Sequence, residues 1–248
     1  MPQYAFREPR LHVDDDLGAG TKLSATPEQA NYLGNVLRLE DGAGILLFNG
    51  RDGEWRAHIE RPSRKRMELS VTDRLRKQTT PSDLHYLFAP LKSARLDYMV
   101  QKATEMGAGA LRPVMTQHTQ APRFNVDRAR ANAVEAAEQC GILSVPATLD
   151  IQKLDTVLAE WDDWRTLVFC DEREDAADPL DILRPLAGRP LALLIGPEGG
   201  FSASERETLR ACAFVMPISL GPRILRADTA AVAALAILQA ACGDWRAS

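Results

Sequence analysis

The chain contains only four cysteines, and none of them stands at the spacing that metal sites or disulfide frameworks use. Cys140, Cys170, Cys212 and Cys242 are far apart and include no CxxC pair. This absence argues against a zinc site and against a fold held together by disulfides. We therefore expect no bound metal ion, and we expect the cysteines to pack as small buried hydrophobic side chains.

Long apolar runs and an excess of positive charge are also absent. No stretch reaches the roughly 18 uncharged apolar residues of a membrane span, and the opening residues MPQYAFREPRLHVDDD lack the apolar core of a signal peptide. We therefore expect a cytoplasmic protein with no membrane partner. The 30 Lys and Arg residues against 34 Asp and Glu give a formal net charge of −4. A nucleic acid would then have to be bound by a local basic cluster.

What is present is enough apolar sequence, 45% of 248 residues, for one large domain or two modest ones. Residues 1–75 contain short alternating runs, among them ILLFNGRDGEW with its turn residues, which predict a small β-barrel. One helix interrupts them at TPEQANYLGNVLRL, with Thr26 as N-cap and Pro27 at the first helical position. The polar segment RLRKQTTPSD then places the domain boundary at residue 75, so that the second domain comprises residues 76–248.

The second domain has a different pattern, because continuous apolar runs such as TLVFC and LALLIG alternate with helical segments. Strands that are covered on both faces have this composition, so we predict an α/β domain with a mostly parallel sheet. Its helices carry recognisable end signals. Gly107 and Gly141 stand where helices end, and Ser202 with Glu205 forms a capping box.

The stretch LALLIGPEGGFSASE, residues 191–205, is an apolar run that stops at a glycine-rich turn and restarts as a helix. A strand, a glycine turn and a helix N-terminus form a general anion site. This turn has neither GK[ST] nor GxGxxG, and Glu198 would repel a phosphate about 4 Å away by on the order of 4 kcal/mol at an effective dielectric of about 20. A neutral or cationic ligand such as S-adenosylmethionine fits better, since glycines let the backbone approach it closely. An ordinary strand-to-helix turn is the competing interpretation.

A second loop, LGPRILRADTAA at residues 220–231, also follows an apolar strand. Asp228 or Thr229 is the expected N-cap of the helix that follows, and Arg223 and Arg226 precede it. A surface ion pair with Asp228 is the simpler explanation of the arginines. Ligands of such sheets bind beyond the carboxyl ends of the strands, so we expect the two loops to face one another.

These two loops together resemble the signature of the bacterial 16S ribosomal RNA uracil-N3 methyltransferases, which belong to the SPOUT superfamily. The resemblance extends over nearly the whole chain, through YAFREPRL, NVLRLEDGAGILLFNG, LKSARLDYMVQKATEMGAGALRPV and EAAEQCG. There are departures: the family usually has Glu in place of Asp228 and a polar residue near Ile142 and Leu143. MTQHTQAPRFN matches poorly, so His118 receives no role.

The resemblance implies a SPOUT-type α/β sheet whose C-terminal segment forms a trefoil knot, a rare exception to the rule that chains do not knot. It also implies a PUA-like barrel before it, a homodimer, and S-adenosylmethionine as methyl donor. The helix DTAAVAALAILQAACG is apolar nearly all round, which suits either the core or a dimer interface. The implied donor pocket consists of Ile195, Gly196, Pro197, Glu198, Gly199, Gly200, Leu220, Gly221, Ile224, Leu225 and Arg226.

The implied reaction is methylation of N3 of a specific uridine in 16S ribosomal RNA, either free or in the small subunit. It requires removal of the N3 proton and stabilisation of charge on O2 and O4. Arg226 or Arg223 can supply the cation. Glu198 or Asp228 can accept the proton, and a water molecule is a third candidate.

Basic residues of the small domain are the candidates for RNA contact. A basic cluster of this kind is more often a solvated hairpin turn, but a PUA-like barrel is an RNA-binding fold. The candidates are Arg7, Arg10, Arg38, Arg61, Arg64, Lys65 and Arg66. Two other functions stay open: a SPOUT methyltransferase with another RNA target, and a non-catalytic RNA-binding factor in ribosome assembly.

Overall fold

The chain divides into two compact units in the computed structural model, which describes residues 8–63, 66–120, 123–171 and 178–245. The first unit runs to Pro81 and also includes Ala137–Val145, and the second comprises Ser82–Ala136 and the residues from Pro146 onward. The boundary expected at residue 75 falls one residue before the end of strand β5 (Arg66–Arg76), where Arg76 still pairs with Glu54. No local sequence signal indicated that residues 137–145 belong to the first unit.

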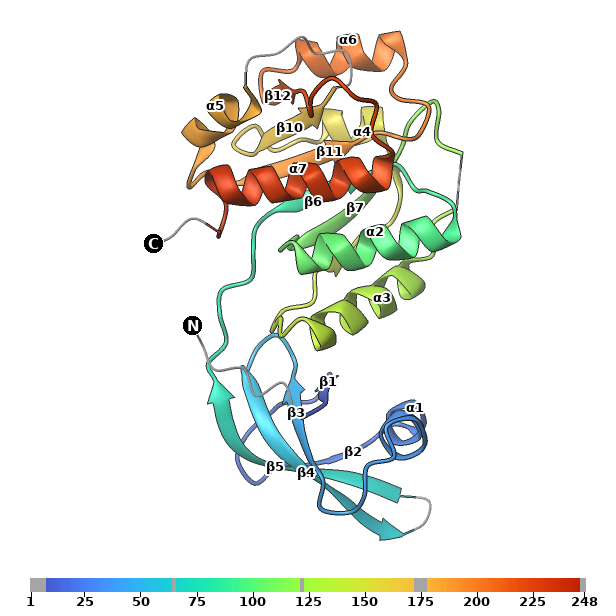
Figure 1. Ribbon diagram of the computed structural model, residues 1–248, viewed down its shortest axis with the longest axis vertical. Helices are drawn as coiled ribbons and strands as arrows, with labels where there is room; N and C mark the ends of the chain where they lie inside the picture. Colours follow the sequence, from blue (N-terminus) through green and yellow to red (C-terminus); the bar gives the residue numbers. More distant parts are fainter. Residues whose placement is uncertain (1–7, 64–65, 121–122, 172–177, 246–248) are drawn as a thin grey trace. The chain divides into compact units, whose positions relative to one another are not determined.

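The first unit is built on one five-stranded sheet in the order β1-β3-β4-β5-β2 (Figure 1). Strands β3, β4, β5 and β2 pair antiparallel, whereas β1 pairs parallel with β3. The core consists of the alternate inward residues of these strands together with Val13, Leu17 and Leu33. The remaining bounds are β1 Arg10–His12, β2 Lys22–Ser24, β3 Gly44–Phe48 and β4 Glu54–Ser63.

The predicted helix of this unit begins as expected. The side chain of Thr26 accepts a hydrogen bond from the Gln29 amide, and Pro27 is the first residue of α1 (Pro27–Asn31). The backbone then widens into a π-helical turn, η1 (Tyr32–Val36), that places Leu33 in the core. Arg38 follows with a φ of 55°, so the helix cannot continue through it.

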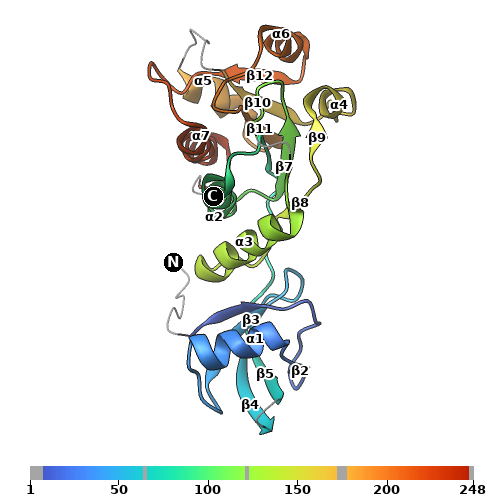
Figure 2. The ribbon, with the colours of Figure 1, turned by 90° about the vertical axis from the view of Figure 1, so that its right-hand side faces the viewer.

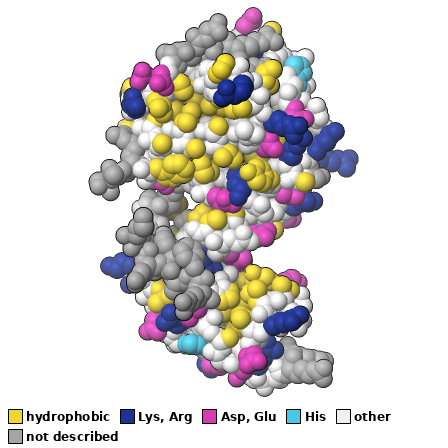
Figure 3. Space-filling model, viewed as in Figure 1, with side chains coloured by type: hydrophobic (Ala, Val, Ile, Leu, Met, Phe, Trp, Pro, Cys, Tyr) yellow, Lys and Arg dark blue, Asp and Glu magenta, His cyan; other side chains and the backbone are white. Residues whose placement is uncertain are grey.

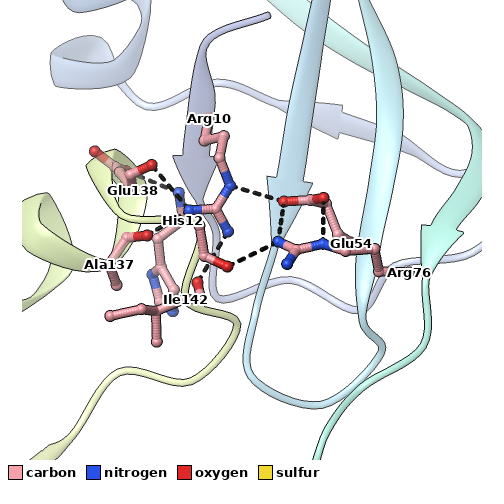
Figure 4. A network of polar contacts seen from close by, with 8 residues as sticks. Arg10, His12, Glu54, Arg76, Ala137, Glu138 and Ile142 are labelled. Carbon is pink, nitrogen blue, oxygen red and sulfur yellow. Dashed lines mark hydrogen bonds and ion pairs between the residues drawn. The ribbon is translucent and has the colours of Figure 1, made fainter. Parts of the chain in front are cut away.

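A buried ion-pair network joins the five-stranded sheet to residues 137–142, all within the first unit (Figure 4). The carboxylate of Glu54, whose side chain is 5% exposed, accepts a hydrogen bond of 2.7 Å from the Nε atom of Arg10 and another of 2.7 Å from that of Arg76. Arg10 also donates to the carbonyl groups of Ala137, Glu138 and Ile142, and Arg76 donates to that of Gly141. The last carbonyls of helix α3 (Val126–Gln139) have no partner within the helix, and Arg10 satisfies two of them, while Arg76 bonds a carbonyl just beyond the helix end.

The second unit has a sheet in the order β12-β10-β11-β6-β7-β8, with β9 also paired to β7, and every pairing is parallel. This confirms the predicted α/β class. Figure 2 shows α2 and α7 on one face of the sheet and α4 and α6 on the other. The strands are β6 His85–Phe88, β7 Ala110–Met115, β8 Ala147–Thr148, β9 Gln152–Lys153, β10 Thr166–Cys170, β11 Leu191–Ile195 and β12 Val215–Ile218.

The helices of this unit cover the sheet by their apolar sides, and α2 and α7 also pack against each other. The expected end signals are present, since Gly107 follows the C-cap of α2 with a φ of 83° and Gly141 has a φ of 71° just after α3. The helices are α2 Ser93–Glu105, α3 Val126–Gln139, α4 Leu154–Ala159, α5 Pro179–Leu183, the 3-10 turn η2 Arg184–Leu186, α6 Ala203–Ala211 and α7 Ala227–Cys242.

The cysteines differ from the expectation. Only Cys242 is buried, whereas Cys170 and Cys212 are half-buried and Cys140 is exposed just after α3. Helix ends face solvent more than strand interiors do, which explains the position of Cys140. Within the described ranges, no helix combines the length and the apolar composition that crossing a membrane requires.

Candidate functional site

A cavity of about 440 Å³ lies at the carboxyl ends of β10, β11 and β12, which are neighbours in the sheet. Parallel strands bring their carboxyl ends to one edge, so loops from distant parts of the chain meet there. The two glycine-bearing loops singled out in the sequence both line this cavity. Its walls consist of Arg95, Cys170, Asp171, Ile195, Gly196, Pro197, Glu198, Gly200, Phe201, Arg206, Leu220, Gly221, Arg223, Ile224, Leu225, Arg226, Ala227 and Ala230.

The first loop is held in a tight turn against α6. The amide of Gly200 donates to the carbonyl of Pro197 at 2.9 Å, and a Cβ on Gly196 would lie 2.5 Å from the ring of Phe201. The predicted capping box is confirmed, because Ser202 accepts from the Glu205 amide and Glu205 accepts from the Ser202 amide. The loop therefore leads directly into a fixed helix N-terminus.

The second loop is open at Gly221, which lines the cavity. Gly221 has a φ of 98°, and apart from its two chain neighbours no heavy atom of the described residues lies within 4 Å of where its Cβ would be. Helix α7 begins at Ala227 with Arg226 as N-cap, so the prediction that Asp228 or Thr229 caps it is wrong. Arg226 has extended backbone and Ala227 is buried, so burial of this alanine favours a helix start two or three residues earlier than predicted.

The predicted residues fall into two groups. All the expected donor-pocket residues except Gly199 line the cavity, and so does Arg223. Gly199 instead faces His118, because a Cβ added to Gly199 would lie 3.3 Å from the Cβ of His118. Asp228 is not among the residues that line the cavity. It lies near the buried Tyr86, where burial is the main cause that raises the pKa of the phenol, and the charges of Cys170 and Asp228 add to it.

Two charged residues that the sequence analysis did not assign, Asp171 and Arg206, line the cavity, and Arg210 joins them from outside its wall. Asp171, at the end of β10, has a fully buried side chain that receives Arg206 at 2.7 Å and Arg210 at 2.9 Å. Asp171 thus holds two guanidinium groups, and it lines the cavity together with one of them, Arg206. The i,i+4 spacing of the arginines on α6 was the available sequence signal, but their common partner lies more than thirty residues earlier.

Two further side chains reach the glycine loop from elsewhere in the second unit. Arg95, in the first turn of α2, forms an ion pair with Glu198, and both side chains are about two-fifths exposed. His118 places its Nδ1 atom 3.1 Å from the carbonyl oxygens of Gly199 and Gly200, so its N–H form donates to this turn. His118, which received no role from the sequence, thus contacts the loop.

Among the described candidates for RNA contact in the first unit, Arg10 differs from the expectation. Arg10 is buried in the network around Glu54 and presents no cation to solvent. Arg38, Arg61 and Arg66 are exposed as expected, with Arg61 donating to the Leu39 carbonyl and Arg66 paired with Glu68. Arg7, Arg64 and Lys65 lie outside the described residues.

Two models of known families match separate parts of the chain. A family model for an RNA methyltransferase domain matches residues 78–239, and one for the PUA domain of RNA methyltransferases matches residues 25–72. A parallel sheet with a cavity at its carboxyl edge, preceded by a small β domain, is thus an RNA methyltransferase architecture with a PUA domain.

Individual relatives show which RNA methyltransferases the chain resembles. The ribosomal RNA small subunit methyltransferase E of Rickettsia conorii is 30% identical over 229 residues, covering 92% of this chain and 93% of the relative. A methyltransferase of Legionella pneumophila solved with bound S-adenosylmethionine superposes with a TM-score of 0.84 at 31% identity, over 95% of this chain and 98% of that one. The small subunit methyltransferase E of Neisseria gonorrhoeae, also solved with this donor, gives a TM-score of 0.83 at 26% identity, over 97% and 100%.

The chain belongs to the ribosomal RNA small subunit methyltransferase E family, and it is therefore an RNA methyltransferase. The trefoil knot predicted for its C-terminal segment follows from this membership.

Proposed function

We propose that the protein transfers the methyl group of S-adenosylmethionine to N3 of a specific uridine in 16S ribosomal RNA of the small subunit. The observation that carries this proposal is the cavity at the carboxyl ends of β10 to β12, into which both glycine-bearing loops open. The names of the curated relatives and the donor bound in two structural neighbours support it.

The residues present fit the donor. The cavity volume lies in the range of small-molecule sites, and at Gly221 a ligand can approach the backbone closely. The carboxylate of Glu198 suits a cationic sulfonium, whereas a phosphate would be repelled there. Arg206 lines the cavity, and its guanidinium group is the proposed partner of the carboxylate of the amino-acid part.

The proposed roles of the chain's own groups follow from their positions. When bound, the donor supplies an electrophilic methyl group on its sulfonium. Arg226 and Arg223 line the cavity from the second loop and are always cationic, so either can stabilise negative charge on the base. Glu198 lines the cavity and is the better proton acceptor, because Asp228 lies outside the wall described for it.

The first unit is the proposed RNA-gripping part. N3 lies on the Watson–Crick edge, so the target uridine must be unpaired or flipped out of its helix while flanking RNA is held. Among the predicted RNA-contact residues that the structure describes, Arg38, Arg61 and Arg66 are exposed and are the proposed cations for this contact. An RNA substrate in the ribosome would place the enzyme in the cytoplasm.

We also propose that the protein acts as a homodimer through α7. The side of this helix that faces away from the sheet is apolar and half-exposed, and Figure 3 shows hydrophobic side chains gathered over this region of the second unit. At the adjacent cavity rim, Ile224 is 90% exposed, which is unusual for a large aliphatic side chain and suits coverage by a second chain. The residues of this α7 face are Val232, Ala233, Ala236, Ile237 and Ala240.

Methyl transfer is tested with labelled donor and RNA that lacks uracil-N3 methylation, supplied either as naked RNA or as assembled small subunits, followed by nucleoside analysis. The expected product is 3-methyluridine. Label on another nucleoside would identify a different RNA target. Failure of the folded protein to bind the donor would favour a non-catalytic assembly factor.

A further inference from the structure

A second cavity, of about 390 Å³, adjoins the one described above. Arg95, Pro197 and Glu198 line both cavities, so the ion pair between Arg95 and Glu198 stands where the two meet. The second cavity is lined by Pro90, Leu91, Lys92, Ala94, Arg95, Gln120, Pro197 and Glu198.

Sheet order explains why the two cavities share a wall. Strand β6 pairs with β11, with Phe88 opposite Ile195, so the segment after β6 lies beside the glycine loop after β11. That segment contributes Pro90, Leu91 and Lys92 and leads into the first turn of α2, where Arg95 stands. The second cavity is therefore another site at the carboxyl edge of the same sheet.

The composition of this cavity suits a planar base with a polar edge. Pro90, Leu91, Ala94 and Pro197 provide apolar walls, and the polar groups are confined to Lys92, Gln120 and the shared ion pair. Flat apolar surfaces bind the faces of a base, while a few fixed polar groups select its edge. The cavity also lies in the volume range of small-ligand sites.

The ion pair itself matches one particular edge. Uracil presents an acceptor, a donor and an acceptor at O4, N3–H and O2, whereas a guanidinium beside a carboxylate presents donors next to an acceptor. Glu198 can therefore accept the N3–H while Arg95 donates to the neighbouring oxygen. We propose that the second cavity receives the target uracil and that Arg95 and Glu198 together bind its Watson–Crick edge. This inference rests on the proposed function.

The arrangement gives each group a part in the reaction. The N3–H bond breaks and its proton passes to Glu198, so N3 can form the new N–C bond from the electron pair left behind. The S–C bond to the methyl group breaks with its electron pair staying on sulfur, which becomes a neutral thioether. Arg95 stabilises the negative charge that develops on the uracil oxygen before the methyl group arrives.

The same geometry discriminates against cytosine. Cytosine has an unprotonated N3, which faces Glu198 as a second acceptor, and a 4-amino donor, which faces the donors of Arg95. Neither group would then gain a hydrogen bond from the base, and each would face a like group on it. Sites that bond a specific edge reject such analogues strongly, and we expect discrimination of at least about a hundredfold.

The test compares Arg95→Gln, Arg95→Lys and Glu198→Gln with the unaltered chain. Donor affinity is measured by calorimetry, and kcat and KM by methyl transfer to RNA. We expect Arg95→Gln to lower kcat by about 10²–10³-fold with little change in donor affinity, and Arg95→Lys to restore part of the loss. RNA with cytidine at the target position should remain unlabelled.

Arg184→Ala is the matched control. It removes an exposed arginine that is paired with an exposed carboxylate, Asp181, at 3.0 Å and that is absent from both cavity walls, so its kinetics should match those of the unaltered chain. Unchanged kcat and KM in Arg95→Gln would overturn the inference, and so would a loss of donor binding that accounts for the whole rate defect. If the unaltered chain itself binds the donor but forms no 3-methyluridine, the proposed function fails instead.

Discussion

At the scale of single residues, Glu54 has the most demanding environment in the first unit, because its buried carboxylate holds two arginines. Burial opposes its ionisation, but hydrogen bonds from Arg76 and Arg10 outweigh burial and lower the pKa of this carboxyl group. Its contribution to stability is thus fully present above the ordinary glutamate pKa and is lost as the pH falls through the lowered value. Glu54→Gln removes the buried carboxylate that Arg10 and Arg76 share, and we expect a loss of about 3–5 kcal/mol at neutral pH.

Chemical unfolding followed by the fluorescence of Trp55 measures this loss. Trp55 is the only tryptophan of the first unit, so replacing Trp161, Trp164 and Trp245 by Phe isolates its signal. Glu60→Gln is the control, because Glu60 is an exposed carboxylate paired with Lys22, and its removal should change the unfolding midpoint little. Equal shifts of the unfolding midpoint in Glu54→Gln and Glu60→Gln would contradict the claim that burial makes the Glu54 ion pairs stabilising.

At the scale of elements, the N-terminus of α6 fixes the glycine loop of the cavity. Its capping box satisfies two amide donors, those of Ser202 and Glu205. Ser202→Ala removes the side-chain acceptor, and we expect the second unit to lose about 1 kcal/mol of stability. Thermal unfolding detected by the fluorescence of Trp161 and Trp164 reports on this unit.

Thr208→Ala provides the comparison on the same helix. Its hydroxyl donates only to the Ser204 carbonyl one turn earlier, and alanine is the better helix former, so stability should stay the same or rise. A Ser202→Ala variant as stable as the unaltered chain would show that the cap does not stabilise α6.

At the scale of the whole molecule, the α7 face defined above is the proposed contact between two copies of the chain. Ala240 on this face is exposed, so a glutamate there is tolerated by the single chain but brings two like charges together across a symmetric interface. We expect Ala240→Glu to convert a dimer into a monomer. Sedimentation equilibrium measures the mass directly.

Ala211→Glu places the same charge on an exposed position of α6 and should leave the dimer intact. A monomeric unaltered chain would contradict the proposed assembly. A dimer that persists in Ala240→Glu would place the contact on another surface.

The sequence by itself determined the features that depend on neighbouring residues. Apolar runs without alternation identified the parallel strands, and Thr26 and Ser202 identified two helix starts, because a cap is formed within a few residues of chain. The two glycine loops were recognisable for the same reason, since a tight turn followed by a helix start is a local pattern. Resemblance to a family then joined them into one site.

Only the tertiary structure decided which distant side chains share an environment. It brought Arg95 to Glu198 and two arginines to Asp171, buried Arg10 in an ion-pair network, and assigned residues 137–145 to the first unit. It also started α7 at Ala227, where burial outweighed the capping preference of Asp228. Such contacts depend on the order of strands in a sheet and on burial, which are properties of the whole fold that no short stretch of sequence contains.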